Sequence, residues 1–214
     1  MTPAAALVHA ARRSVALGLN QGTSGNISAR LDGGRFLISP SGARLDELHP
    51  EGLALLSLGD EVVAGQPSSE WRLHRDIYRA RADVGGVLHT HSRFATTLAC
   101  LREDLPAAHY LIAAAGTALV RCSRYATFGT AELSSAAVEA LGSAGACLLA
   151  NHGLVAVGST VVEALEVACD IESVAEWYCR AKAVGQPILL DDKEMEDALA
   201  GFRDYRSART KPSA

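Results

Sequence analysis

The first segment of the chain carries an apolar residue at every fourth position. The members of this row are Leu7, Ala11, Val15 and Leu19. A spacing of four places side chains on one face of a helix. Thr2 and Pro3 are a typical helix start, because a hydroxyl can cap the first turn and proline suits the first helical position. The pattern predicts an amphipathic helix over residues 3–19, ended by Gly22.

Alternating polar and apolar residues follow, as is typical of half-buried strands. Residues 26–31 and 35–39 flank the turn Asp32-Gly33-Gly34, so they predict a hairpin. A second pair of short strands is predicted at 53–58 and 61–63. Apolar runs bounded by glycine or polar residues predict the remaining strands at 86–91, 118–122, 146–150 and 154–157.

Helical spacing returns between these strands. It predicts helices at 68–82, 92–101, 110–115, 130–141, 160–184 and 192–202. Because helices and strands alternate while several successive strands are joined by tight turns, we expect an α/β protein. Its central sheet should be mixed but mostly antiparallel, with helices on both faces. No repeat, low-complexity segment or linker divides the chain, so we expect one domain over residues 1–214.

The composition is that of an ordinary globular protein, since 49% of the 214 residues are hydrophobic and 21% are charged. A net charge of −4 predicts no broad basic face, so neither nucleic acid nor an anionic membrane is expected as a partner. The five cysteines form no C-x-x-C pair and are expected to be free thiols. We recognise no signal peptide and no membrane-spanning run, so a cytoplasmic location is expected.

The strongest candidate for chemistry is a pair of histidines in the stretch GGVLHTH. Positions i and i+2 of a strand share a face, so His89 and His91 should point the same way and could form half of a metal site. Glu70 lies upstream and His152 downstream, too far apart in sequence for spacing to establish a site. By itself, the pair fits ordinary polar residues at a strand end as well as it fits a metal site. A lone histidine such as His152 is more often structural than a ligand. We expect a structural role for His9, His49 and His74.

Three turns of small residues could bind an anion. They contain Gly25 and Asn26, Ser41 and Gly42, and Ser68 and Ser69. Each turn offers backbone N–H groups together with hydroxyl or amide donors, and the third precedes a predicted helix whose N-terminus favours an anion. Together they could hold a phosphate without a lysine. Each turn taken singly is more typical of an ordinary turn, and none matches a Walker loop or a dinucleotide fingerprint.

Seven motifs occur in the order seen in the class II aldolase/adducin family: GTSGNISAR, ISPSG, SSEWRLHRDIY, VLHTHS, HYLIAAAG, YATFGT and NHGLVAVG. From about Leu7 to Tyr205 the chain resembles this family, and within it most closely the bacterial L-fuculose-phosphate aldolases. The joint order of the motifs is far more specific than any single turn. The resemblance implies a three-layer α/β/α sandwich, assembled as a homotetramer with fourfold symmetry.

The resemblance also implies roles for individual residues. It implies a zinc ion held by His89, His91 and His152, with Glu70 as a further ligand and the catalytic carboxylate. Cobalt or manganese are expected substitutes. The substrate phosphate is expected on Gly25, Asn26, Ser41, Gly42, Ser68 and Ser69. Tyr110 is expected to reach the active site of a neighbouring subunit. The aldehyde end of the substrate is expected beside Phe128, Phe202 and Tyr205.

The implied reaction is the reversible cleavage of a ketose 1-phosphate, such as L-fuculose 1-phosphate, to dihydroxyacetone phosphate and an aldehyde. Glu70 is then a general base and zinc a Lewis acid, so no Schiff-base lysine is needed. One alternative is a methylthioribulose-1-phosphate dehydratase or another sugar-phosphate lyase or epimerase of the same fold. The other is a non-catalytic, adducin-like interaction module, against which the intact histidines and Glu70 argue.

Overall fold

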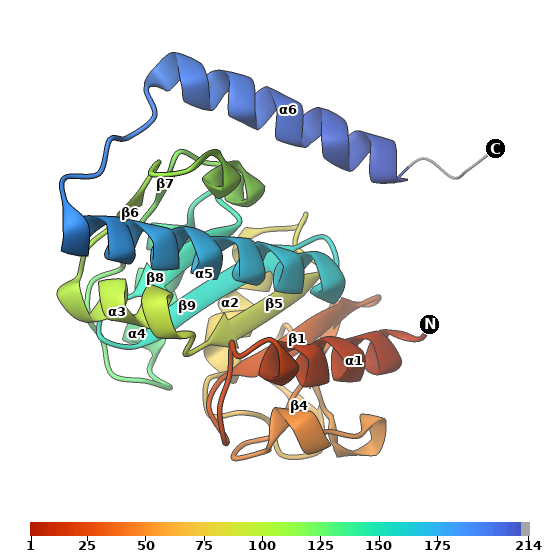
Figure 1. Cartoon of the computed structure of the whole chain (residues 1–214). Coiled ribbons are helices and arrows are strands. Elements are labelled where there is room, and N and C mark those ends of the chain that lie inside the picture. The colour runs from red at the N-terminus through yellow and green to blue at the C-terminus, as the bar shows by residue number, and fades with distance from the viewer. Residues whose placement is uncertain (211–214) are drawn as a thin grey trace.

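The centre of the fold is a seven-stranded sheet with the strand order β4-β3-β2-β1-β5-β9-β8 (Figure 1). The computed structural model describes the backbone of residues 1–210 and the side chains of residues 1–204. Neighbouring strands in this sheet all pair antiparallel. The strands are β1 (Asn26–Leu31), β2 (Arg35–Ile38), β3 (Ala54–Ser57), β4 (Val62–Ala64), β5 (Gly86–Thr90), β8 (Ala146–Leu149) and β9 (Gly153–Gly158).

Helices cover both faces of the sheet. The longer ones are α1 (Pro3–Ala16), α2 (Trp71–Ala80), α3 (Arg93–Leu101), α4 (Ala131–Leu141), α5 (Val161–Val184) and α6 (Asp192–Thr210). Two hydrophobic clusters lie on opposite sides of the sheet, one with α1, α3 and α5 and the other with α2 and α4. On β5, Val87 packs in the second cluster and its neighbour Leu88 in the first. The expected α/β/α sandwich is therefore confirmed.

The sheet is more uniformly antiparallel than the expected mixed arrangement. Among the described residues, parallel pairing is confined to an isolated bridge between Cys122 and Leu148. Central strands are buried on both faces, and every residue of β5 and β8 is buried. Their continuous apolar runs therefore reflect helices above and below rather than parallel neighbours.

Several element ends differ from the sequence prediction. The first helix stops at Ala16 rather than at residue 19, because Leu17 caps it and Gly18 adopts a φ of +77°. The strand predicted at 118–122 shrinks to β7 (Leu119–Val120), which pairs with an unpredicted strand, β6 (Leu105–Pro106). The helix predicted at 192–202 continues to Thr210.

Short 3-10 helices complete the connections. The predicted helix at 110–115 is one of them, η3 (Tyr110–Ala115), and it ends at Gly116. The other two are unpredicted, η1 (Leu45–Glu47) and η2 (Pro50–Gly52). Among the described helices, none combines the length and apolar character needed to cross a bilayer.

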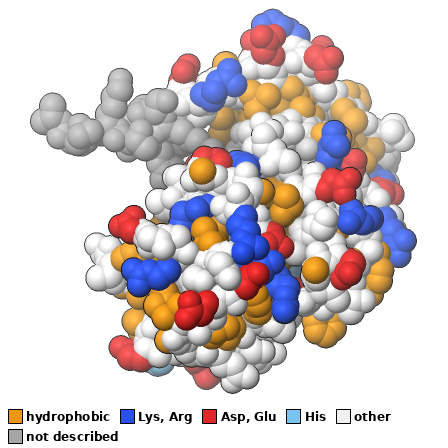
Figure 2. All heavy atoms as spheres, turned by 180° about the vertical axis from the view of Figure 1, so that it is seen from behind, with side chains coloured by type: hydrophobic (Ala, Val, Ile, Leu, Met, Phe, Trp, Pro, Cys, Tyr) orange, Lys and Arg blue, Asp and Glu red, His pale blue; other side chains and the backbone are white. Residues whose placement is uncertain are grey.

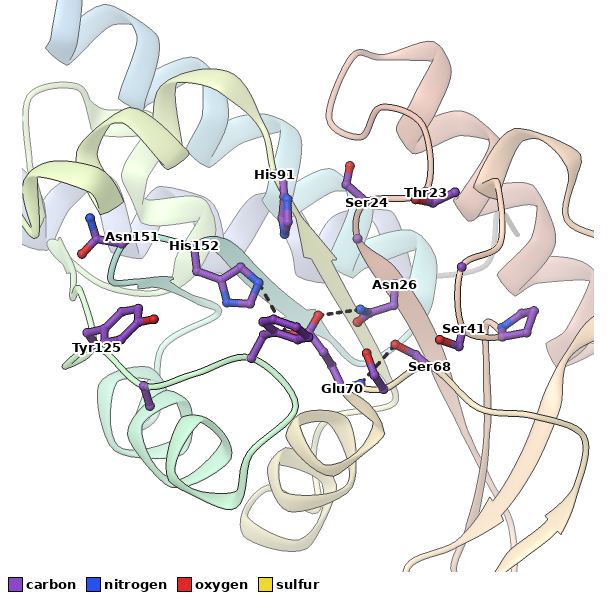
Figure 3. Close-up of a pocket in the computed structure, with 16 residues that line it drawn as sticks. Thr23, Ser24, Asn26, Ser41, Ser68, Glu70, His91, Tyr125, Asn151 and His152 are labelled. Atoms are coloured by element: carbon purple, nitrogen blue, oxygen red, sulfur yellow. Dashed lines mark hydrogen bonds and ion pairs between the residues drawn. The ribbon is translucent and has the colours of Figure 1, made fainter.

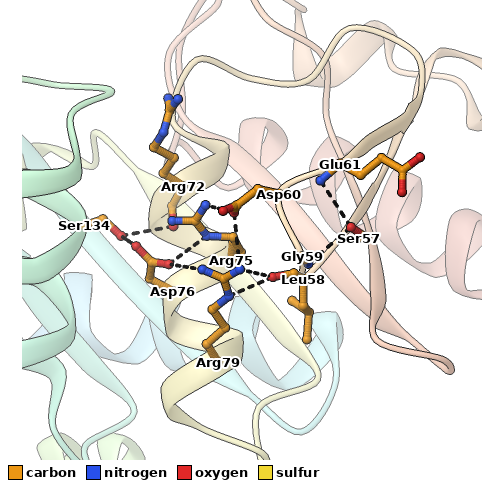
Figure 4. A network of polar contacts seen from close by, with 10 residues as sticks. All are labelled: Ser57, Leu58, Gly59, Asp60, Glu61, Arg72, Arg75, Asp76, Arg79 and Ser134. Carbon is orange, nitrogen blue, oxygen red and sulfur yellow. Dashed lines mark hydrogen bonds and ion pairs between the residues drawn. The ribbon is translucent and has the colours of Figure 1, made fainter.

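A polar network anchors the outer side of α2 (Figure 4). Arg75 pairs with Asp60 in the β3–β4 turn and with Asp76 on its own helix. Ser134 of α4 donates a hydrogen bond of 2.6 Å to Asp76. Arg79 donates to the carbonyl of Leu58. These contacts hold α2 in place, and α2 begins directly after Glu70.

The described surface mixes both signs of charge. On the face seen in Figure 2, acidic and basic side chains are interspersed and do not separate into two regions. Helix α6 is the outermost element above α5 in Figure 1, and it packs on η3.

Candidate metal centre and phosphate pocket

Three histidines converge at one end of the central strands. His89 lies on β5 and His91 one residue beyond its end. Their Nε2 atoms are 3.1 Å apart, as expected for side chains that leave the strand on one face. His152 follows β8 in a tight turn, where Asn151 adopts a left-handed φ of +54°. One nitrogen of each ring lies within 4.8 Å of the others, which is the spacing of a metal-binding triad.

The three rings are neutral and therefore able to bind a cation. His89 Nδ1 donates to the carbonyl oxygen of Leu154 at 3.0 Å, so the lone pair of its ring lies on Nε2. Burial, followed by repulsion from the other two rings, lowers the pKa of His89 well below its ordinary value. Burial also lowers the pKa of His91 and of His152. At neutral pH the cluster presents uncharged nitrogen donors.

Glu70 adds a carboxylate to this cluster (Figure 3). Its Oε2 accepts a hydrogen bond of 2.8 Å from Asn26 Nδ2 and lies 3.5 Å from His89 Nε2. Its Oε1 lies 3.5 Å from His152 Nε2, is buried, and accepts no hydrogen bond from the described residues. A buried carboxylate oxygen without a donor is costly unless a cation or substrate satisfies it. The donor set of one carboxylate and three imidazoles therefore fits a divalent metal such as zinc.

Beside the cluster lies a cavity of about 300 Å³. The three predicted turns meet on its wall, His91 and His152 line it from the other side, and Glu70 lies between His152 and Asn26 (Figure 3). Its lining residues are Thr23, Ser24, Gly25, Asn26, Pro40, Ser41, Gly42, Ser68, Ser69, Glu70, His91, Tyr125, Ala126, Phe128, Asn151 and His152. None of these described residues is a lysine or an arginine. An anion here would rely on N–H and O–H donors beside a metal.

Gly25 brings the first turn against the metal site. Its φ of +76° is left-handed. A Cβ at this position would overlap Asn20 Oδ1 and the carbonyl oxygen of His89. Asn20 in turn accepts a hydrogen bond of 3.3 Å from the backbone N–H of His91. Only glycine lets this turn lie so close to the histidine strand.

The turns differ in how much of their donor capacity is free. Ser68 is buried, and its Oγ accepts a hydrogen bond from the backbone N–H of Glu70 at 3.3 Å. The side chain of Asn26 is directed to Glu70 and to His74 rather than to the open cavity. Ser41 and Ser69 line the cavity from separate turns. Glu70 itself occupies the cap position of α2, one residue before the helix rather than in its first turn.

Not all predicted site residues come together within one chain. Phe128 lines the cavity beside the histidines. Tyr110 and Phe202 lie elsewhere, with ring centroids 6.4 Å apart, on a separate apolar cavity of about 900 Å³ between α1, η3, α5 and α6. Tyr110 is 55% exposed there. The side chain of Tyr205 lies outside the described residues.

The structure adds residues that the sequence did not single out. Thr23 and Ser24 line the cavity from the same small-residue loop as Gly25, so the loop composition was a usable signal. Tyr125 and Asn151 belong to the motifs YATFGT and NHGLVAVG, which gave them no role of their own, and they also line it. His74, expected to be merely structural, contacts Asn26 directly behind Glu70. Its spacing of four residues from Glu70 was the available signal.

This fold, with histidines and a carboxylate beside a donor-lined cavity, matches a known class of enzyme. The family described as Class II Aldolase and Adducin N-terminal domain matches residues 5–179. The chain belongs to this family. The protein is therefore a class II, metal-dependent aldehyde-lyase.

Individual relatives narrow the comparison. A 5-methylthioribulose-1-phosphate/5-deoxyribulose-1-phosphate aldolase of Rhodospirillum rubrum is 45% identical over 208 residues, covering 97% of this chain and 94% of the relative. A 5-deoxy-D-ribulose 1-phosphate aldolase of Bacillus thuringiensis is 44% identical over 197 residues, covering 91% and 92%. A solved L-fuculose 1-phosphate aldolase superposes with a TM-score of 0.91 at 38% identity, covering 94% of this chain and 96% of that structure.

Proposed function

We propose that the protein is a zinc-dependent aldolase that reversibly cleaves a ketose 1-phosphate to dihydroxyacetone phosphate and an aldehyde. The observation that carries this proposal is the shared cavity. The triad of neutral histidines adjoins this cavity with Glu70, and three donor-rich turns line it. A phosphorylated sugar with a carbonyl near its phosphate would reach from the turns to the histidines.

In this proposal His89, His91 and His152 hold the metal and Glu70 completes the set. Three imidazoles and a carboxylate favour zinc among common cellular metals, and cobalt or manganese should substitute. The bound metal would polarise the substrate carbonyl and so lower the cost of charge that develops on its oxygen. The resident carboxylate must then be able to exchange between metal and substrate, and the unpartnered Oε1 of Glu70 is suited to that.

The residues of the chain supply the proton transfers. In the condensation direction Glu70 takes the proton from the carbon of dihydroxyacetone phosphate that attacks the aldehyde. Tyr110 of a neighbouring subunit donates its hydroxyl proton to the aldehyde oxygen as the carbon–carbon bond forms. Cleavage reverses both transfers. The phosphate is held by N–H and O–H groups of the three turns, which orients the bond to be broken.

The names of the relatives suggest which ketose to test first. A panel of 5-methylthioribulose 1-phosphate, 5-deoxyribulose 1-phosphate and L-fuculose 1-phosphate, with dihydroxyacetone phosphate as the readout, should yield turnover with at least one member. A dehydratase would consume a panel member without forming dihydroxyacetone phosphate. An interaction module would consume none.

If the three turns bind the substrate phosphate, the same assay should give a second result. The unphosphorylated ketose should be a very poor substrate of the wild type. Ser69→Ala should weaken use of the 1-phosphate roughly tenfold to a hundredfold, since a hydrogen bond to a charged group contributes about 1.5–3 kcal/mol. The variant should barely change the residual rate with the free ketose. Equal use of both ketoses by the wild type would contradict a phosphate site.

We further propose that the active protein is a homotetramer with sites at subunit interfaces. Support comes from Tyr110, which is exposed on an apolar cavity away from the metal cluster of its own chain. Tyr110→Phe and Glu70→Gln chains, each inactive alone, should regain activity when mixed under conditions that exchange subunits. A mixed interface can then pair an intact tyrosine with an intact glutamate. No recovery despite proven exchange would assign both residues to one chain.

The proposal extends to the domain organisation, cellular location and partners of the protein. We propose that residues 1–214 act as one domain in the cytoplasm, with a small phosphorylated sugar as substrate and no nucleic acid or membrane partner. All five cysteines are free thiols, which supports a reducing compartment.

A further inference from the structure

A ladder of buried polar side chains runs behind the carboxylate, between α2 and β1. Glu70 caps α2, and His74 and Tyr78 follow it at intervals of four residues on one face of the helix, while Asn26 and Ser28 share one face of the strand. The two rows interdigitate. All five side chains belong to residues that are at most 7% exposed.

Hydrogen bonds connect these side chains one after another. Asn26 Nδ2 lies 2.8 Å from Glu70 Oε2, and His74 Nε2 lies 2.5 Å from Asn26 Oδ1. On its other side, His74 Nδ1 lies 2.7 Å from Ser28 Oγ. Ser28 Oγ lies 2.8 Å from Tyr78 OH, which ends the ladder. No solvent-exposed group interrupts this series.

The chemistry of the groups sets a single direction along the ladder. A carboxylate only accepts, so Asn26 must turn its NH₂ to Glu70 and its oxygen to His74. That oxygen only accepts, so His74 must carry its proton on Nε2. Burial lowers the pKa of His74 to about 3, which keeps the ring neutral and makes Nδ1 an acceptor. Ser28 then donates to Nδ1 and accepts from Tyr78.

We propose that His74 is a positioning residue whose Nε2–H locks the Asn26 amide in the orientation that donates to Glu70 Oε2, leaving Glu70 Oε1 directed toward His152. Without this donor the Asn26 oxygen is buried and unpaired, and the amide is held by the carboxylate alone, so it can tilt away from Glu70 Oε2. Glu70 would then lose the contact that selects which of its oxygens faces the cavity. The catalytic consequence rests on the proposed function, in which Glu70 moves a proton, whereas the orientation of the ladder does not.

Turnover of three variants tests the catalytic part. His74→Leu removes the donor and should lower kcat roughly tenfold to a hundredfold, with KM within about threefold. His74→Gln keeps an N–H at a similar reach and should recover most of that loss. Ser134→Ala is the matched control, because it removes a hydroxyl that contacts Arg72 and Asp76 on the opposite side of α2. It should leave kcat within about threefold.

The ring nitrogens of His74 provide a readout that is independent of turnover. In ¹⁵N-labelled wild type at neutral pH, with and without bound metal, His74 should show a protonated Nε2 and an unprotonated Nδ1. The signals are assigned by their loss in His74→Gln. A protonated Nδ1 overturns the proposal, and so does a His74→Leu variant with wild-type kcat. Wild type that forms no dihydroxyacetone phosphate from any ketose would refute the proposed function and leave the tautomer result standing.

Discussion

Replacing Glu70 by glutamine should leave a folded protein that retains substrate affinity but turns over about 10²–10⁴-fold more slowly, the usual contribution of a positioned general base. Glutamine preserves the size of the side chain and can still contact Asn26. It cannot take a proton from carbon, and it is a poorer metal ligand than a carboxylate. The loss should therefore fall on kcat far more than on KM.

The comparison that isolates the base uses a second carboxylate of the same chain. Glu61 lies exposed in the β3–β4 turn, so Glu61→Gln removes the same charge without touching the cavity. Its kcat should match that of the wild type. Steady-state kinetics on the best ketose 1-phosphate, with unfolding curves for each protein, make the comparison. Wild-type turnover in Glu70→Gln would remove Glu70 from the mechanism.

Removing two imidazoles should have an equally large effect. The double variant His89→Ala, His91→Ala eliminates two of the three neutral nitrogens that lie within 4.8 Å of one another. A single imidazole and a carboxylate do not hold a divalent metal tightly, so elemental analysis should find almost none. Because the metal supplies several kcal/mol of charge stabilisation, activity should fall by about 10³-fold or more.

A control must separate loss of the site from loss of any histidine. His49 is exposed and far from the cluster in sequence, and its Nδ1 lies 3.4 Å from Arg12. His49→Ala should retain the metal content of the wild type. Circular dichroism of the double variant checks that the sheet survives, since His89 is fully buried. A full metal complement in the folded double variant would refute the assignment.

The layers of the fold could be predicted from local patterns because those patterns reflect burial. Alternation around Asp32-Gly33-Gly34 indicated the β1–β2 hairpin, and helical spacing located α5 within a residue at its N-terminal end. Two-residue strands such as β6 and β7 are too short to show any period. The residues of α6 beyond Phe202 are mostly polar, so the sequence shows no helical spacing of apolar residues that would have predicted this part of the helix.

The site was only partly predictable, because sheet order decides which distant residues meet. Strand geometry alone predicted that the side chains of His89 and His91 point to the same face. That Asn26 pairs with His89 across β1 and β5 is a matter of register, which periodicity does not encode. His74 looked structural because one buried histidine gives no hint of its partners. The proposed role of Tyr110 needs a second chain, which no pattern in one chain specifies.

Dihydroxyacetone phosphate release by one preparation, measured as purified, after complete chelation and after return of zinc, tests the metal-dependent cleavage most directly. Activity should disappear with the metal and return as zinc approaches about one ion per chain, the number that the cluster of His89, His91 and His152 can hold. Undiminished release of dihydroxyacetone phosphate from protein shown by elemental analysis to be free of metal would contradict it.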